Sequence, residues 1–169
     1  YSQILKDEVA LSKEKFKKID LVPIIQSVVD DYNSIYQVKR GINISCFNDG
    51  NKSYLINGIE NRIEQIVANL LDNAISFSDN NQNIEVKISK NSKKEILLNI
   101  LDEGPGFKEK DTSKIFKRFY SNRPDKFGQH SGLGLNIVKN LTDLHIASIS
   151  ALNRRDRDGA NLEIIFPKV

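Results

Sequence analysis

Three side chains at four-residue intervals mark one candidate edge for ligand binding. Asn69, Asn73 and Phe77 line up along the border of an apolar stripe if their segment is helical. An Asn side-chain carbonyl is a neutral hard oxygen, which suits Mg²⁺ when phosphates and waters supply the remaining ligands. The alternative interpretation is that these asparagines only make cap and turn hydrogen bonds at the edge of a helix.

A carboxylate followed by glycines forms a second candidate site. Asp102 comes directly after an apolar, strand-like segment, and Gly104 and Gly106 follow it where the backbone could approach a ligand closely. A carboxylate that faces an apolar pocket can accept a hydrogen bond from an exocyclic amine such as that of adenine. Because Asp-x-Gly-x-Gly is also common in ordinary turns, a purely structural turn is the alternative.

A glycine-rich segment at residues 130–135 opens the last predicted helix. Ser131 is placed to cap that helix, and the glycines leave backbone N–H groups open to a ligand. Helix N-termini of this kind bind phosphate, although the spacing is neither that of a Walker loop nor that of a Rossmann turn. A glycine-rich hinge is the alternative. His130 and His145 are the two histidines, too few for a histidine metal cluster.

The elements that position these segments follow from hydrophobic periodicity. The clearest pattern predicts a helix over residues 61–77, with its apolar residues on a single stripe. Residues 84–88 and 96–101 are predicted strands joined by a polar hairpin turn. Residues 103–129 have little periodicity, and so long an excursion in a compact domain predicts a mobile, functional lid.

The flanking segments complete the predicted architecture. Residues 1–16 form a weakly amphipathic helical pattern, and Pro23 begins a helix that extends to about residue 36. Residues 42–45 and 53–56 are predicted to pair as a hairpin. The remaining predicted elements are a helix over 132–145 and a strand pair over 147–153 and 161–166 around a charged turn at 154–159.

This order of elements predicts an α/β fold, a two-layer sandwich with helices on one face of a mixed, mostly antiparallel sheet.

The 169 residues, of which 39% are hydrophobic and 28% charged, suit one globular domain. A net charge of +3 spread over mixed charges does not indicate a nucleic-acid partner. The single Cys46 excludes an internal disulfide, and no run is apolar enough to span a membrane. The absence of methionine predicts an excised fragment.

The order and separation of the three candidate segments resemble those of the ATP-binding domain of bacterial sensor histidine kinases. Their wider superfamily includes DNA gyrase, the mismatch-repair ATPases and a heat-shock chaperone. Residues 69–74 resemble the N box, 102–106 the first glycine box and 132–135 the second. Residues 115–120 are similar to the F box, which distinguishes the kinases from the rest of the superfamily. The resemblance extends from about residue 19 to the end and implies a Bergerat-type ATP-binding fold.

The resemblance implies a binding site for ATP and Mg²⁺. It implies that Asn73 coordinates Mg²⁺, that Asp102 binds the adenine amine and that Phe77 lines the purine pocket. Asn69 stands where the hydrolytic members place a general-base Glu, and an amide cannot take a proton from water. The predicted nucleotide-binding residues, with Arg123 or Lys126 supplying charge to the terminal phosphates, are Asn69, Asn73, Phe77, Asp102, Gly104, Gly106, Ile115, Tyr120, Arg123, Lys126, His130, Ser131, Gly132, Leu133, Gly134 and Leu135.

Several departures from the family pattern shape the expectation. Ser76 replaces a phosphate-binding Lys found in many of these kinases, and His145-Ile146-Ala147 lacks the usual Gly-Gly after His. No His-Glu phosphoacceptor motif precedes the N box, so this chain is expected to bind ATP without phosphorylating itself. Residues 1–17 are assigned to the end of a dimerisation-domain helix and linker, and 18–169 to the catalytic domain.

The implied partners are the kinase's own dimerisation domain, as a homodimer, and a response regulator. The implied location is the cytoplasmic side of an inner-membrane parent protein. Two other functions are alternatives. A regulatory nucleotide-binding module of anti-sigma type would need neither the F box nor the helical preface. A gyrase-like ATPase would need Glu in place of Asn69 and a later domain that carries a lysine.

Overall fold

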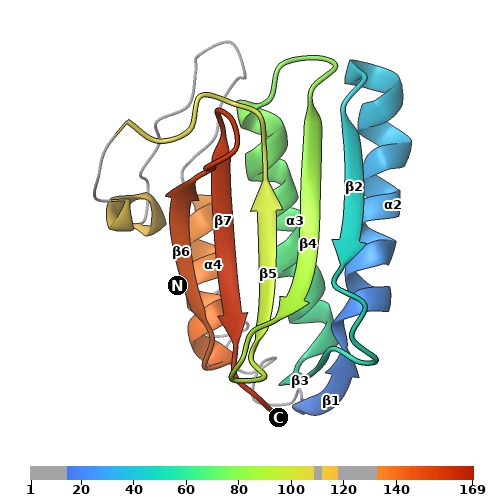
Figure 1. The fold of residues 1–169 in the computed structure, drawn as a ribbon, viewed down its shortest axis with the longest axis vertical. Helices are drawn as coiled ribbons and strands as arrows, with labels where there is room; N and C mark the ends of the chain where they lie inside the picture. Colours follow the sequence, from blue (N-terminus) through green and yellow to red (C-terminus); the bar gives the residue numbers. More distant parts are fainter. Residues whose placement is uncertain (1–14, 109–111, 118–132) are drawn as a thin grey trace, which may run out of the picture.

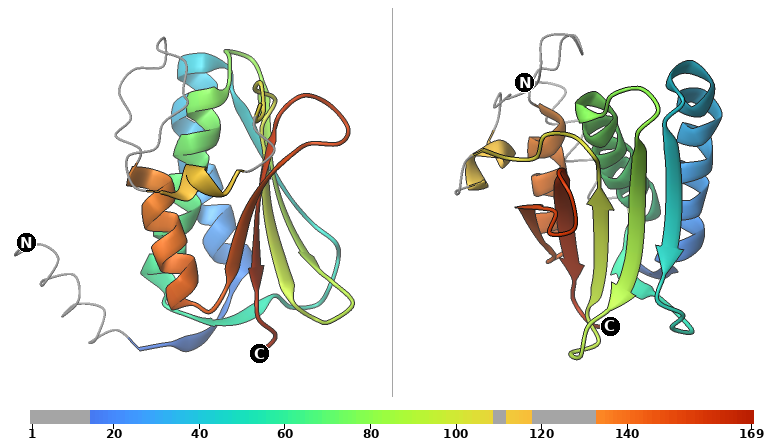
Figure 2. Two further views of the ribbon diagram at one scale, coloured as in Figure 1. Left: turned by 90° about the vertical axis from the view of Figure 1, so that its left-hand side faces the viewer. Right: turned by 45° about the horizontal axis from the view of Figure 1, so that its top comes forward.

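A computed structural model describes residues 15–108, 112–117 and 133–169 of the chain, with no description of the Leu133 side chain. Within them, three helices cover one face of a five-stranded sheet, and the other face of the sheet carries no helix (Figures 1 and 2). This arrangement confirms the predicted two-layer α/β sandwich. The helices are α2 (Leu21–Arg40), α3 (Glu60–Phe77) and α4 (Leu133–Leu144), with a short 3₁₀ helix η1 (Ser113–Phe116).

The sheet is mixed, as predicted. Its strand order is β2-β4-β5-β7-β6, with β2 parallel to β4 and every other neighbouring pair antiparallel. A separate two-stranded sheet joins β1 to β3. The strands are β1 (Lys17–Asp20), β2 (Asn43–Asn48), β3 (Leu55–Gly58), β4 (Asn83–Lys90), β5 (Ile96–Leu101), β6 (Ser148–Asn153) and β7 (Ala160–Phe166).

The pairing of β2 corrects one prediction. The hairpin predicted between residues 42–45 and 53–56 is wrong, because β2 pairs in parallel with β4 and β3 pairs antiparallel with β1. Parallel neighbours need a long crossover connection, and the segment containing β3 and α3 provides it. Strand β1 was not among the predicted elements. The predicted hairpins β4–β5 and β6–β7 are confirmed.

Local capping fixes the ends of α2 beyond the predicted limits. Asp20 accepts a hydrogen bond from the Val22 backbone N–H at 3.1 Å, so the helix begins before Pro23. Gly41 ends the helix in the left-handed conformation, with φ +65°. The helix therefore runs four residues past the predicted end. The helical pattern predicted for residues 1–16 lies almost wholly outside the described residues.

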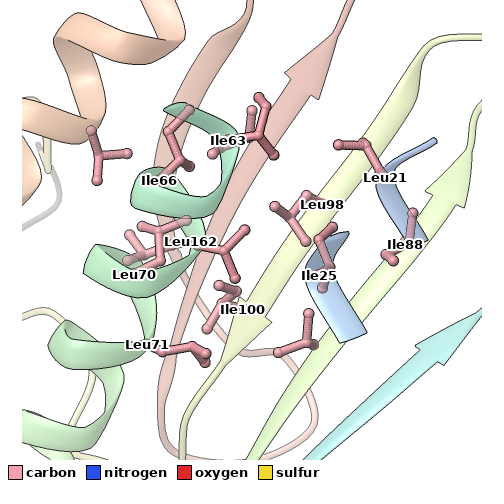
Figure 3. Close-up of a cluster of buried hydrophobic side chains, with 14 of the residues drawn as sticks. Leu21, Ile25, Ile63, Ile66, Leu70, Leu71, Ile88, Leu98, Ile100 and Leu162 are labelled. Atoms are coloured by element: carbon pink, nitrogen blue, oxygen red, sulfur yellow. The ribbon is translucent and has the colours of Figure 1, made fainter. Parts of the chain in front are cut away.

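The core lies between the helices and the inner face of the sheet. The predicted apolar stripe of α3 is confirmed, since its members are buried against the inward-facing side chains of β4, β5 and β7 (Figure 3). Leu21 and Ile25 of α2 enter the same cluster. This packing fixes the position of α3 over the sheet. It also fixes Asn69 and Asn73, the asparagine row, along the border of the apolar stripe. None of the helices in the described part of the chain is long and apolar enough to span a membrane.

Candidate nucleotide-binding site

The asparagine row lies on α3, beside the first turn of α4. Asn69 is partly buried, and its Nδ2 lies 3.5 Å from the Gly134 carbonyl oxygen. This contact joins the predicted N box to the second glycine segment. Asn73 is only 5% exposed, yet within the described residues its side-chain amide makes no hydrogen bond. An amide held near the surface without a partner is suited to a ligand that brings its own charge.

Ser76 occupies the next turn of the same helix. Its hydroxyl donates a 2.7 Å hydrogen bond to the Asn73 backbone carbonyl, and its side chain is buried. A buried hydroxyl that is directed back onto its own helix does not extend toward a phosphate group.

Asp102 is a buried carboxylate at the end of β5, where it is 3% exposed. Its Oδ1 accepts hydrogen bonds from the backbone N–H of Gly104 at 2.9 Å and of Ala160 at 3.1 Å. No group among the described residues donates to Oδ2. One carboxylate oxygen is therefore fixed by the protein, and the other is left for an outside donor.

The charge state of Asp102 is set by opposing effects. Burial raises the pKa of this carboxyl above its ordinary value, while the two N–H donors and the positive charge of Arg154 lower it. Hydrogen bonds to the ionised form favour the carboxylate even where water is excluded. The donors and Arg154 favour the ionised form that accepts a hydrogen bond, against the larger effect of burial, which leaves the pKa of Asp102 raised overall.

The two glycines after Asp102 have different surroundings. A Cβ on Gly104 would lie 2.6 Å from the Phe77 carbonyl oxygen, so only glycine lets this turn reach the end of α3. Gly106 has φ +73°, and a Cβ there would meet Asn153 at the end of β6 and Gly159 of the β6–β7 connection. Gly104 thus joins the Asp102 turn to the asparagine helix, whereas Gly106 shapes the turn from its other side.

The other predicted site residues divide into described and undescribed groups. Ile115 lies in η1 and is buried in the hydrophobic core. Leu133 begins α4, and Gly134 and Leu135 lie in its first turn. Gly134 has open space where a Cβ would be. Outside the described residues lie Tyr120, Arg123, Lys126, His130, Ser131 and Gly132, together with most of the predicted lid.

Two residues that hold Asp102 were not predicted as site residues. Ala160 supplies a backbone N–H to Oδ1, and Arg154 donates to the Asp102 carbonyl oxygen at 3.1 Å. A signal for Ala160 was available, because pairing the strand that ends at Asp102 with the last strand places Ala160 beside it. Arg154 lay within a turn that the sequence marked only as charged.

Comparison with known proteins identifies the family. The profile of the family described as "Histidine kinase-, DNA gyrase B-, and HSP90-like ATPase" matches residues 58–169. The chain belongs to this family. The matched region includes α3, the Asp102 turn and α4, so every described residue of the candidate site lies within the ATPase domain.

The relatives of this ATPase domain include sensor proteins. ChvG of Rhizobium meliloti is 33% identical over 155 residues, which cover 88% of this chain and 27% of that protein. ChvG of Agrobacterium fabrum is 35% identical over 155 residues, covering 88% of this chain and 26% of that protein. The chain thus spans about a quarter of the length of these two relatives. It is homologous to the ATPase domains of sensor histidine kinases.

Solved structures share the fold of this ATPase domain. The catalytic domain of histidine kinase ThkA matches with a TM-score of 0.77 at 25% identity, over 91% of this chain and 96% of that one. A structure of ThkA in complex with the response regulator protein TrrA matches with a TM-score of 0.75 at 24% identity, over 99% of this chain and 47% of that one. These likenesses confirm the predicted arrangement of helices and sheet.

The described side chains fit the ligands that this family implies. The described residues include no group of three or more His, Cys, Asp and Glu side chains that could form a protein cage for a metal ion. Mg²⁺ does not need such a cage, because it commonly keeps one or two protein ligands beside substrate phosphates and waters. Among the described residues, the Asn73 amide and Asp102 Oδ2 have no hydrogen-bond partner, and they are of the types that Mg²⁺ and an adenine amine require.

Proposed function

We propose that this domain binds Mg-ATP and supplies the γ-phosphoryl group to a histidine on a separate dimerisation domain, from which a response-regulator aspartate takes it. The observation that carries the proposal is the junction of α3 with the Asp102 turn. Gly104 packs against the Phe77 carbonyl, so a buried carboxylate with one open oxygen is held at the end of the asparagine helix. Family membership supports the same conclusion.

Asp102 selects the base in this proposal. Its fixed Oδ1 orients the carboxylate, and Oδ2 accepts a hydrogen bond from the adenine 6-amino group. A base with a carbonyl at that position would place an acceptor against an ionised carboxylate, which is unfavourable. Phe77, at the end of α3, contributes apolar surface to the same pocket.

Asn73 holds the metal in this proposal, through its side-chain carbonyl. Bound there, Mg²⁺ would partly neutralise the negative charge of the ATP phosphates. Asn73 contributes position and no net charge. Backbone N–H groups at the start of α4, around Gly134 and Leu135, bind phosphate oxygens. Arg123 or Lys126 adds positive charge from the lid.

Asn69 explains why the phosphoryl group would be kept for a protein acceptor. Its amide cannot act as a general base toward water, and its Nδ2 is directed to the Gly134 carbonyl. Positioning of ATP against an acceptor, with slow hydrolysis, is the behaviour that such a site favours. A gyrase-like ATPase would require a carboxylate at this position.

The partners of the domain are proposed from its relatives. Residues 1–17 would belong to the end of a dimerisation-domain helix and linker, with residues 18–169 as the catalytic domain. The parent would be a homodimeric inner-membrane sensor that holds this domain in the cytoplasm. The ThkA–TrrA complex supports a response regulator as the final acceptor.

Transfer in trans tests the proposal. The domain is mixed with its dimerisation domain and γ-labelled ATP, and label on the acceptor histidine is measured. We expect transfer that requires Mg²⁺ and that Asn73→Ala abolishes together with Mg²⁺-dependent ATP binding. Asn80→Ala, an exposed Asn just beyond α3, is the matched control and should leave ATP binding intact. ATP binding without any transfer would refute the kinase assignment and favour a regulatory nucleotide-binding module.

A further inference from the structure

We propose that Arg154 is a positioning residue for nucleotide binding, whose buried guanidinium holds the Asp102 backbone in place and keeps its carboxylate ready to accept a hydrogen bond. The inference rests on the proposed function, in which Asp102 binds the adenine amine. Arg154 lies in the connection between β6 and β7, more than 50 positions along the chain from Asp102. It is not expected to touch the nucleotide.

The Arg154 side chain is buried more completely than a surface turn would require. Only 1% of the side chain is exposed, although the acidic partners around it reach the surface. Its NH1 donates to the Asp102 carbonyl oxygen at 3.1 Å. Its Nε and NH2 each bind Asp156 at 3.0 Å, and NH2 also lies 3.3 Å from Glu85 Oε1. The planar guanidinium thus contacts Asp102, Asp156 and Glu85 at the same time, which a Lys ammonium could not reproduce.

The turn that carries Arg154 is folded tightly onto Asp102. The Arg154 backbone N–H donates to the Gly159 carbonyl at 2.9 Å, which closes the turn. A Cβ on Gly159 would meet both the Asp102 carbonyl oxygen and the Arg154 Cδ. The next residue, Ala160, donates its N–H to Asp102 Oδ1. Three residues at the two ends of one short connection therefore act on Asp102. Arg154 supplies a positive charge, Ala160 donates to the carboxylate, and Gly159 leaves room for the Asp102 backbone.

Arg154 also acts on the charge of Asp102. Burial raises the pKa of Asp102, and Arg154 is the one cationic side chain of the described residues that lowers it. The other charges near this junction are acidic or paired: Glu103 raises the pKa of Asp102, and Arg157 is ion-paired to Glu103. Glu85 and Asp156 pair with Arg154 itself. Removal of the guanidinium would leave Asp102 buried beside acidic groups, which favours its protonated form.

Nucleobase preference as a function of pH tests the inference. Dissociation constants for Mg-ADP and for the inosine analogue, Mg-IDP, are measured from pH 5.5 to 7.5. The two ligands share their phosphates, so the ratio of their constants cancels phosphate titration. The ratio therefore reports the interaction of Asp102 with the base, because IDP has an acceptor in place of the 6-amino group. The wild-type chain should prefer ADP, and the preference should weaken as falling pH protonates Asp102.

The decisive variant is Arg154→Met, which keeps much of the side-chain length and removes the charge. We expect ADP affinity at pH 7 to fall about tenfold or more, with the midpoint of the preference moved to higher pH. The ADP affinity and the midpoint of Arg154→Lys should lie between those of Arg154→Met and of the wild-type chain. Lys keeps the positive charge but lacks the forked donors of the guanidinium. Arg155→Met, at the exposed neighbouring position, is the control and should match wild type.

The possible outcomes separate this inference from the proposed function. Unchanged ADP affinity and midpoint in Arg154→Met would overturn the inference, as would an equal loss for ADP and IDP without a shift in midpoint. Asp102→Asn should abolish the pH-dependent preference; if it does not, the adenine assignment itself fails. If Arg154→Met does not fold, NMR titration of the Asp102 carboxyl carbon in the wild-type chain decides. A midpoint at or above pH 7 would then overturn the inference.

Discussion

The backbone N–H of Ala160, at the start of β7, donates a 3.1 Å hydrogen bond to Oδ1 of Asp102, at the end of β5. The Asp102 N–H in turn donates to the Ala160 carbonyl at 3.1 Å. The carboxylate is therefore oriented by the neighbouring strand of the sheet as well as by its own turn. A site held in this way depends on the sheet remaining intact, so changes at this junction should affect both the stability of the domain and its ligand affinity.

Gly104→Ala should disturb both stability and nucleotide binding. The new Cβ would lie 2.6 Å from a backbone carbonyl oxygen of α3, and backbone cannot rotate away as a side chain can. We expect a loss of about 1–3 kcal/mol in the free energy of unfolding, measured by urea denaturation, together with weaker ADP binding. Wild-type stability in this variant would show that the turn and the helix can separate.

Gly134→Ala is expected to separate the two properties. Gly134 lies in the first turn of α4, and beyond its own stretch of helix no atom of the described residues lies within 4 Å of where its Cβ would be. Replacing a helical Gly by Ala should raise the free energy of unfolding by about 0.5–1 kcal/mol. If phosphates approach the backbone there, Mg-ADP affinity should nevertheless fall. Gain of stability with unchanged affinity would place the phosphates elsewhere.

Ile146→Gly should stabilise the domain. The turn that lacks the family's Gly-Gly is still formed, with Ile146 at φ +57°, a conformation that a β-branched residue adopts only at a cost. The side chain is 82% exposed, so little burial is lost on its removal. We expect a gain of about 0.5–1 kcal/mol and a higher Tm.

Lys94→Gly provides the comparison, because Lys94 also has positive φ, at +68°, and is exposed but not β-branched. Its gain should be smaller than that of Ile146→Gly. A loss of stability in Ile146→Gly would mean that the exposed side chain makes contacts that outweigh its backbone strain.

Buried His145 should make stability depend on pH in the neutral range. Its Nε2 accepts from the Ile59 N–H at 3.1 Å, and its Nδ1 lies 2.8 Å from the Leu141 carbonyl oxygen, so the neutral form with a proton on Nδ1 satisfies both contacts. Burial lowers the pKa of His145, against a smaller opposing effect of the Leu141 carbonyl. The unfolded chain therefore takes up a proton before the folded chain does.

The sign of this dependence is definite. The free energy of unfolding should fall as the pH drops below about 6.5, toward the lower folded pKa, and should recover above it. Carboxyls whose pKa is lowered, such as Glu103 and Asp156, lose their contributions only at more acidic pH. Chemical denaturation from pH 7.5 to 5.5 measures the slope. His145→Gln should flatten this slope; an unchanged slope in His145→Gln would assign it to another group.

The sequence by itself determined the elements whose signals are local. The apolar stripe of α3 needs only residues three and four apart, and the β4–β5 hairpin needs only neighbouring strands and a polar turn. The candidate residues on α3 and after β5 were found for the same reason.

Only the tertiary structure decided which distant segments meet. Strand β2 has an alternating pattern that suits either a hairpin or a parallel partner, and the pairing with β4 depends on the crossover formed by β3 and α3. Arg154 could not be distinguished from its exposed neighbour Arg155 by type or spacing. Arg154 differs because the β6–β7 connection places its guanidinium against the Asp102 backbone. Charges and hydrogen bonds have larger effects in that buried environment than at the surface.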